Sequence, residues 1–175
     1  IGLAITGSFC NYPKVQKLIQ DLKEEKAERI IPIISKVYDT RFYEGEKFIK
    51  MLKEETKEEI VDTIVKAEPI GPKNMVDIIL VVPCTGNTIA KLANGITDTP
   101  VTMAVKSHIR NNKPVLIGVS TNDGLGVNLK NIGILLETKN YYFVPFKQDN
   151  PITKPRSVVF DPSYIIKTLE YFVQI

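Results

Sequence analysis

Histidine, cysteine and long apolar runs are the scarce features of this 175-residue sequence. It has one histidine, two cysteines and no Cys-x-x-Cys pair, so it lacks the ligand clusters that zinc sites need. No apolar stretch approaches the roughly 20 residues that span a bilayer, and no signal-peptide pattern opens the sequence. Two cysteines in a chain of cytosolic character indicate reduced thiols. We therefore expect a cytoplasmic protein without a metal site or a membrane segment.

The net charge is also small, at +3, although charged residues make up 25% of the chain. That is too little to indicate binding to nucleic acid or to an anionic membrane. Lysine and glutamate alternate in residues 21–28 and 44–59, which is typical of solvated helix faces. The chain is long enough to bury a sizeable core, and it contains neither an internal repeat nor a low-complexity linker. These properties predict a single domain over residues 1–175.

Apolar runs alternate with amphipathic helical patterns along the chain. Strands are expected at residues 1–6, 29–35, 76–82, 114–120 and 141–146, with a further short strand at 59–65. Helices are expected around residues 15–22, 44–55, 89–96, 125–136 and 165–173, and another from a cap at Asp98 to about residue 112. Strands that alternate with helices indicate parallel βαβ units. The predicted fold is therefore α/β, with a doubly wound parallel sheet.

Polar residues follow most of the predicted strands. Ligands of such sheets bind outside the carboxyl ends of the strands, so these segments form the candidate site. Small residues let backbone N–H groups approach a ligand, and hydroxyls can donate to phosphate oxygens. The segments are Thr6-Gly7-Ser8, Ser35-Lys36, Pro83-Cys84-Thr85-Gly86-Asn87-Thr88, Ser120-Thr121-Asn122-Asp123-Gly124 and residues 146–151. Together they suit a phosphorylated planar molecule with polar edges.

Helix capping is the alternative explanation for each segment. Residues 6–8 could form a capped tight turn, and Ser35 could cap the next element. The length and polar density of residues 83–88 favour a functional loop instead. The chain has no Gly-x-Gly-x-x-Gly pattern, and Lys14 does not stand in a Walker context. A mononucleotide therefore fits these loops better than NAD or ATP does.

The single histidine, His108, lies in a polar stretch and is expected at a surface or interface. General base catalysis would then fall to a carboxylate, a lysine, a cysteine or a cofactor. Asp123 is the first carboxylate to consider, because it lies in a loop after a sheet strand. Cys84 precedes a helix N-terminus, where a thiolate is favoured; a small packed residue in a tight loop is the more ordinary interpretation of that position.

The segment PCTGNTIAKLANGITDTP, residues 83–100, is similar to the Pro-Ala-Ser/Thr-Ala-Asn-Thr segment of the homo-oligomeric flavin-containing cysteine decarboxylases. The opening ITGS and Ser35 match that family as well. The resemblance implies a three-layer Rossmann-like (flavodoxin-type) fold with about six strands, and FMN as the cofactor. It implies FMN contacts from Gly7, Ser8, Ser35, Pro83, Cys84, Thr85, Gly86, Asn87 and Thr88, with Ser120, Thr121 and Asn122 covering the flavin or the substrate.

The sequence also departs from the decarboxylase pattern. Pro69 stands about where those enzymes place a catalytic histidine, and their Pro-x-Met-Asn motif is replaced here, so that only Asn122 survives. Their cysteine-bearing substrate lid is missing, and Gly86 replaces an alanine. These departures weigh against oxidative decarboxylation of a peptidyl cysteine.

Further segments extend the likeness to one branch of the family over nearly the whole chain. They include DTRF, AEPIGPK, STNDGLG and TKNYYFVPFKQDNPITKP. This likeness implies an oxidoreductase subunit that forms an aromatic dicarboxylate from a dihydro precursor during spore formation. It also implies a separate dehydrogenase subunit that carries NAD(P), and a trimer-based homo-oligomer. The catalytic candidates are Asp123 and Asn122, and Lys36, Arg41 and Lys106 are candidates for binding the substrate carboxylates by position.

Two other functions remain open. One is an FMN-dependent decarboxylase or prenyltransferase-like flavoenzyme of the same fold. The other is a non-catalytic binding or scaffold protein for the dehydrogenase, which the sparse set of catalytic side chains favours.

Overall fold

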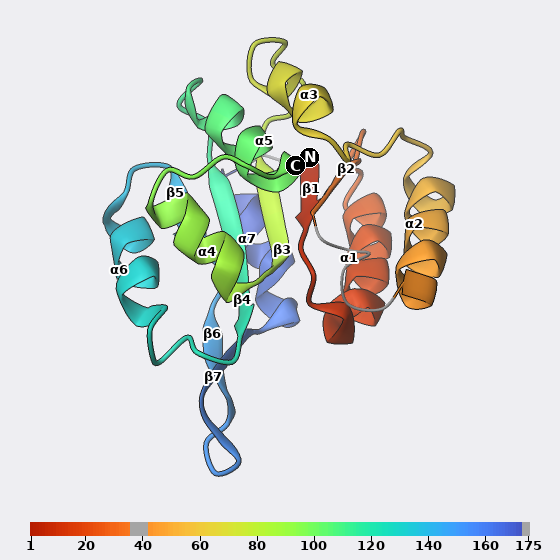
Figure 1. The fold of residues 1–175 in the computed structure, drawn as a ribbon. Helices are drawn as coiled ribbons and strands as arrows, with labels where there is room; N and C mark the ends of the chain where they lie inside the picture. The colour runs from red at the N-terminus through yellow and green to blue at the C-terminus, as the bar shows by residue number, and fades with distance from the viewer. Residues whose placement is uncertain (36–41, 173–175) are drawn as a thin grey trace.

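A single mixed sheet of seven strands organises the computed structural model, which describes residues 1–35 and 42–172 (Figure 1). The strands are β1 Gly2–Ile5, β2 Ile31–Ile34, β3 Ile79–Cys84, β4 Val115–Thr121, β5 Tyr141–Phe143, β6 Phe146–Asn150 and β7 Lys154–Phe160. Their order is β2-β1-β3-β4-β7-β6, and β5 also pairs with β4. The pairings among β1, β2, β3, β4 and β5 are parallel. The predicted α/β class is confirmed.

Helices cover both faces of the sheet and make the molecule three-layered (Figure 1). The α-helices are α1 Tyr12–Glu24, α2 Phe42–Thr56, α3 Ile64–Ala67, α4 Gly86–Ala93, α5 Pro100–Ile109, α6 Leu129–Glu137 and α7 Ile165–Phe172. Short 3-10 helices are η1 Phe9–Asn11, η2 Glu68–Ile70 and η3 Pro162–Tyr164. Among the described residues, none of these helices is both long and apolar enough to cross a bilayer.

The side chains of β3 point alternately to the two faces of the sheet and contribute to two separate hydrophobic clusters. Leu80 and Val82 pack with the buried residues of α1, α2 and α7, whereas Ile79 and Val81 pack with those of α4, α5 and α6. Successive strand residues point to opposite faces of a sheet, so one apolar strand can serve both layers. All six residues of β3 are buried, which fixes it as the central strand.

Two local expectations differ from the structure. Residues 59–65 form only an isolated bridge, between Val61 and Ile33, and α3 begins at Ile64. The Thr63 side chain accepts a hydrogen bond from the Lys66 N–H, and this cap directs the segment into a helix. The cap of α5 is Thr99 rather than Asp98, and it forms a reciprocal capping box with Thr102.

The carboxyl-terminal part of the sheet is antiparallel, which the sequence patterns did not predict. The expected strand at 141–146 divides into β5 and β6, and β6 and β7 form a hairpin that projects from the body (Figure 1). β5 pairs with the first half of β4, whereas β7 pairs with Ser120 and Thr121 in the second half. Pro155 and the exposed residues around it hide the strand pattern of β7. This pairing places β7 beside the carboxyl end of β4.

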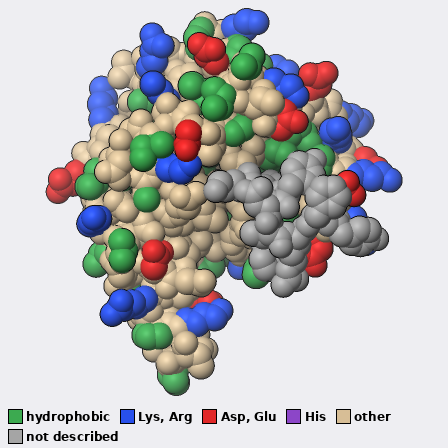
Figure 2. Space-filling model, viewed as in Figure 1, with side chains coloured by type: hydrophobic (Ala, Val, Ile, Leu, Met, Phe, Trp, Pro, Cys, Tyr) green, Lys and Arg blue, Asp and Glu red, His purple; other side chains and the backbone are tan. Residues whose placement is uncertain are grey.

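The surface carries mixed charge. On the face shown in Figure 2, basic and acidic side chains are interspersed, and apolar side chains are scattered among them. No broad basic stripe of the kind that binds nucleic acid is visible on that face.

His108 is buried rather than at a surface or interface, so that expectation is wrong. It shares a face of α5 with Val101 and Val105, seven and three positions away, and this face packs against the sheet. Its Nε2 lies 3.1 Å from the Pro114 carbonyl oxygen. Because a carbonyl can only accept, Nε2 carries the proton. Burial lowers the pKa of His108 to about 4.

We expect folding stability to fall as the pH drops from 6.5 to about 4. An unfolded-state histidine has a pKa near 6.5, so the unfolded chain takes up a proton that the folded chain refuses. The contribution of His108 is complete above pH 6.5, and up to about 3 kcal/mol is lost by pH 4. Urea midpoints at pH 7.5, 5.5 and 4.5 measure this loss. In His108→Gln the urea midpoint should depend less on pH between 6.5 and about 4. An equal dependence in both proteins would contradict the attribution of this loss to His108.

Candidate functional site

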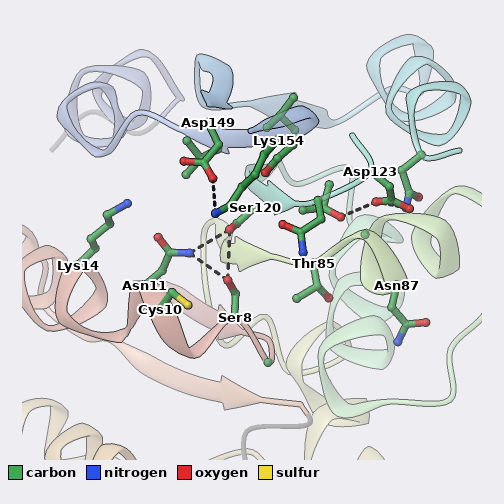
Figure 3. Close-up of a pocket in the computed structure, with 18 residues that line it drawn as sticks. Ser8, Cys10, Asn11, Lys14, Thr85, Asn87, Ser120, Asp123, Asp149 and Lys154 are labelled. Carbon is green, nitrogen blue, oxygen red and sulfur yellow. Dashed lines mark hydrogen bonds and ion pairs between the residues drawn. The ribbon is translucent and has the colours of Figure 1, made fainter. Parts of the chain in front are cut away.

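A cavity of about 650 Å³ lies at the carboxyl ends of β1, β3 and β4 (Figure 3). This volume is within the usual range for small-molecule sites, about 300–1,000 Å³. Nine of the residues predicted from the sequence line it: Gly7, Ser8, Thr85, Gly86, Asn87, Ser120, Thr121, Asn122 and Asp123. The topology brings three loops that are far apart in the sequence to one place.

Other lining residues were not predicted from the sequence. Some come from η1 and the start of α1, one precedes α6, and the rest come from β7: Cys10, Asn11, Lys14, Asn128, Lys154, Ser157, Val158 and Val159. Asp149, which lies in the predicted segment 146–151, lines the cavity as well. The residues at the start of α1 could have been predicted from the sequence, because they follow the loop after β1. The residues of β7 could not, because their place depends on an antiparallel pairing that no local pattern indicated.

Three side chains form a compact polar cluster at the centre of the cavity (Figure 3). Asn11 Nδ2 donates to both Ser8 Oγ and Ser120 Oγ at 2.9 Å, and the two hydroxyls are 3.2 Å apart. The cluster ties the loop after β1 to the end of β4. Both serine hydroxyls retain donor or acceptor capacity for a ligand.

The end of β3 is fixed by a threonine at the end of β1. Thr6 Oγ1 donates to the Pro83 carbonyl at 2.9 Å and accepts from the Thr85 N–H at 3.0 Å. α4 then begins at Gly86. Gly86 and Asn87, its first residues, line the cavity, so the positive end of the helix dipole lies at the cavity wall.

Asp123 is held by three hydrogen bonds on its carboxylate. Thr121 Oγ1 donates to Oδ1 at 2.6 Å, and Asn128 Nδ2 lies 3.0 and 2.9 Å from Oδ1 and Oδ2. These bonds, that from Thr121 first, hold the pKa of Asp123 below its usual range. The carboxylate is therefore ionised at neutral pH, which suits an acceptor or electrostatic role better than a strong base.

Gly86 makes room for this arrangement. A Cβ at this position would lie 2.5 Å from both Thr121 Oγ1 and Asn128 Nδ2, and 2.8 Å from Asp123 Oδ1. Each of these atoms belongs to the hydrogen-bonded set around the carboxylate. Glycine at the start of α4 is thus a condition for the geometry of Asp123.

The other residues predicted for the site lie away from the cavity in the described part of the chain: Ser35, Pro83, Cys84 and Thr88. Ser35 Oγ accepts from the Val101 N–H at 3.0 Å in the first turn of α5. Cys84 is buried, and burial raises the pKa of its thiol, so it is neutral at pH 7. Thr88 Oγ1 lies 3.2 Å from Thr85 Oγ1. These contacts are structural.

In the part of the chain that the structure describes, two lysines supply positive charge at the cavity. Lys14 projects from α1, and Lys154 projects from β7 and pairs with Asp149 at 3.1 Å (Figure 3). Of the lysines and arginine predicted by position, Lys106 is exposed on α5 away from the cavity, and Lys36 and Arg41 lie outside the described residues. Within residues 1–35 and 42–172 there is no group of three or more potential metal ligands.

Comparison with known proteins shows the family. The flavoprotein family model matches residues 1–155, and the chain therefore belongs to the flavoprotein family. The chain is 46% identical over 173 residues to the B subunit of dipicolinate synthase from Bacillus subtilis strain 168, covering 97% of this chain and 86% of the relative.

Solved structures agree with this assignment. The crystal structure of the dipicolinate synthase B subunit from Bacillus halodurans superposes with a TM-score of 0.87 at 45% identity, over 97% of this chain and 88% of that chain. An FMN-dependent cysteine decarboxylase matches with a TM-score of 0.67 at 18% identity, over 95% and 92% of the two chains. At that identity the second match shows the shared fold.

We expect Gly86→Ala to destabilise the fold by about 1–3 kcal/mol, because its Cβ displaces buried hydrogen-bond partners. The matched control is Gly133→Ala in α6, where a Cβ meets nothing within 4 Å. There the higher helix propensity of alanine should stabilise the protein by up to about 1 kcal/mol. Urea unfolding of both variants measures the difference, and equal shifts of the same sign would refute the role given to Gly86.

Proposed function

We propose that this chain acts as the B subunit of a dipicolinate synthase. Its substrate would be a dihydrodipicolinate-type dicarboxylate, its product dipicolinic acid made during sporulation in the cytoplasm, and its partner the A subunit of dipicolinate synthase. The likeness to two proteins of that name over 97% of the chain supports the assignment. The observation that carries it is the cavity, where hydroxyls, amides and two lysines surround space for a small anionic ligand.

FMN fits the donor set of the cavity. Serine and threonine hydroxyls and the start of α4 suit a phosphate, and asparagine amides suit the polar edge of a flavin. Val158 and Val159 offer apolar contact to a ring. Ser8 and Ser120 are the residues that would hold the phosphate, and Asn87 is assigned to the ring by the family resemblance.

A dihydropyridine dicarboxylate becomes aromatic when it loses a hydride and a proton. FMN, when bound, or NAD(P) on the dehydrogenase partner supplies the two-electron acceptor for the hydride. The chain's own residues bind and orient the diacid: Lys14 and Lys154 offer cations to its carboxylates, and Asn122 and Asp123 face it from the loop after β4. The gain of aromaticity favours the reaction, so the demands on general base catalysis are modest.

A non-catalytic role is the second candidate. His108 and Cys84 are buried, and the carboxylate of Asp123 has a lowered pKa. A chain with so few reactive groups could bind the substrate and present it to the dehydrogenase. The family resemblance also suggests a trimer-based homo-oligomer in either case.

The purified protein should show flavin absorption after incubation with FMN and gel filtration. Ser8→Ala should weaken FMN affinity about 10-fold, because one hydrogen bond to a charged group is lost. Thr168→Ala serves as the control, since Thr168 lies on α7 outside the cavity lining and its hydroxyl donates to the Tyr164 carbonyl of η3. Absence of FMN binding at excess cofactor would remove the flavin from the proposal and leave the scaffold role. Asn87→Ala with unchanged FMN affinity would remove the assigned position of the ring.

Turnover of freshly made dihydrodipicolinate, with and without the dehydrogenase partner, tests the reaction. Lys14→Gln should raise KM about 10-fold and change kcat little, because it removes a cation that attracts the substrate in ground and transition states alike. Lys17→Gln is the matched control, since Lys17 lies three positions later on the same helix and pairs with Asp21 at 2.8 Å. Equal KM values in both variants would exclude Lys14 from substrate binding.

A further inference from the structure

Two buried asparagines stand behind Asp123. Asn131 Nδ2 in α6 donates to Asn128 Oδ1 at 2.8 Å, and Asn128 Nδ2 donates to the carboxylate of Asp123. Asn131 is 4% exposed and Asn128 is 6% exposed. The bond from Asn131 engages the oxygen of the Asn128 amide, so the NH₂ of that amide is directed at the carboxylate.

Burying these two amide side chains costs free energy, and packing alone does not account for that cost. A buried amide loses its hydration and contributes little net stability even when it is fully hydrogen-bonded. Asn131 lies beside the buried Ile132 on α6, where an apolar side chain would fill the space at lower cost. What the two amides provide is a fixed orientation for Asp123 at the cavity wall.

The carboxylate keeps capacity for one more partner. Oδ1 accepts two of the described side-chain hydrogen bonds and Oδ2 accepts only one, so Oδ2 is the oxygen that can accept from a further donor. Asp123 lies on the opposite side of the cavity from Lys14, with Ser8, Asn11 and Ser120 between them (Figure 3). A ligand that spans the cavity therefore meets a cation at one end and a fixed anion at the other.

We propose that Asn128 and Asn131 are positioning residues, which hold Asp123 to accept a hydrogen bond from an N–H or O–H group of the bound ligand. The proposal rests on the proposed function, because it concerns the same cavity. The ligand it describes is an anionic planar heterocycle that carries a hydrogen-bond donor. A flavin has such a donor in a ring N–H, and a dihydropyridine dicarboxylate has one where its ring nitrogen is protonated.

The test compares Asn131→Leu and Asn128→Asp with the control Gly133→Ala, using FMN and dipicolinate as separate binding probes and KM for the dihydro precursor. Asn131→Leu should weaken donor-bearing FMN, or raise KM, about 10-fold at pH 7, and Gly133→Ala should change neither. Dipicolinate, whose aromatic nitrogen carries no proton, should be affected less. A loss for FMN alone assigns the contact to the cofactor, and a rise in KM alone assigns it to the substrate.

The pH dependence of ligand binding or of KM distinguishes a positioning role of Asn128 from a purely stabilising one. Asn128→Asp brings two carboxylates within hydrogen-bond distance, so one retains its proton at higher pH. The acidic limb of the affected binding or KM profile should move upward by about one pH unit or more. Among the described residues, the other ionisable groups facing the cavity are Cys10, Lys14, Asp149 and Lys154, and Arg156 packs against Gly126 of the same loop. They are common to both proteins, so the difference reports Asp123.

A ¹³C titration of the Asp123 carboxyl measures the positioning without any ligand. The pKa in the wild-type protein should lie below the ordinary aspartate value and rise in Asn131→Leu. An ordinary pKa, or profiles of Asn128→Asp that overlay the wild type, would overturn the proposal even if turnover is observed. If wild-type protein neither binds the probes nor supports turnover, the proposed function fails and the ligand contact fails with it; the titration then decides the positioning role alone.

Discussion

The hydroxyl of Thr6 is the contact on which the cavity depends. It bonds to both sides of the turn after β3, through the Pro83 carbonyl and the Thr85 N–H, and so holds the ends of two parallel strands together. α4 starts immediately after this turn, with its first residues at the cavity wall. The serine cluster then ties the same region to β4. The buried Thr6 and the serine cluster together hold in place the three loops that carry the polar groups.

The periodicity of apolar residues predicts where strands end, and polar residues that follow those strand ends line the cavity. Nine predicted residues line one cavity, since each follows a buried apolar run and parallel strands end at one edge of the sheet. Ser35 also follows a buried strand, and its hydroxyl accepts a hydrogen bond from the Val101 N–H in the first turn of α5. No local pattern distinguishes a serine that caps a helix from a serine that faces a ligand, because both need the same small polar side chain.

What the sequence did not reveal depends on contacts between distant segments. The hairpin reaches the cavity by pairing antiparallel to the second half of β4, and its exposed, proline-containing first half of β7 carries no strand pattern. Asn128 and Asn131 flank the start of α6 as polar residues ordinarily do, and only packing reveals that they are buried. His108 was misplaced for the converse reason: its neighbours in sequence are polar, while its neighbours in space are apolar.

β5 and β7 pair with different halves of the same edge of β4. This arrangement limits where the chain can accept insertions and deletions. β7 is registered to β4 through Ser120 with Val159 and Thr121 with Val158, and these four residues also line the cavity. The tip of the hairpin lies several residues away and is exposed. Insertions or deletions at the tip leave the paired residues in register. A slip of one residue between β7 and β4 would exchange the faces of Val158 and Val159 and rebuild one wall. The hairpin can therefore change length at its tip without altering the cavity, whereas a change of length at its base would alter the cavity wall.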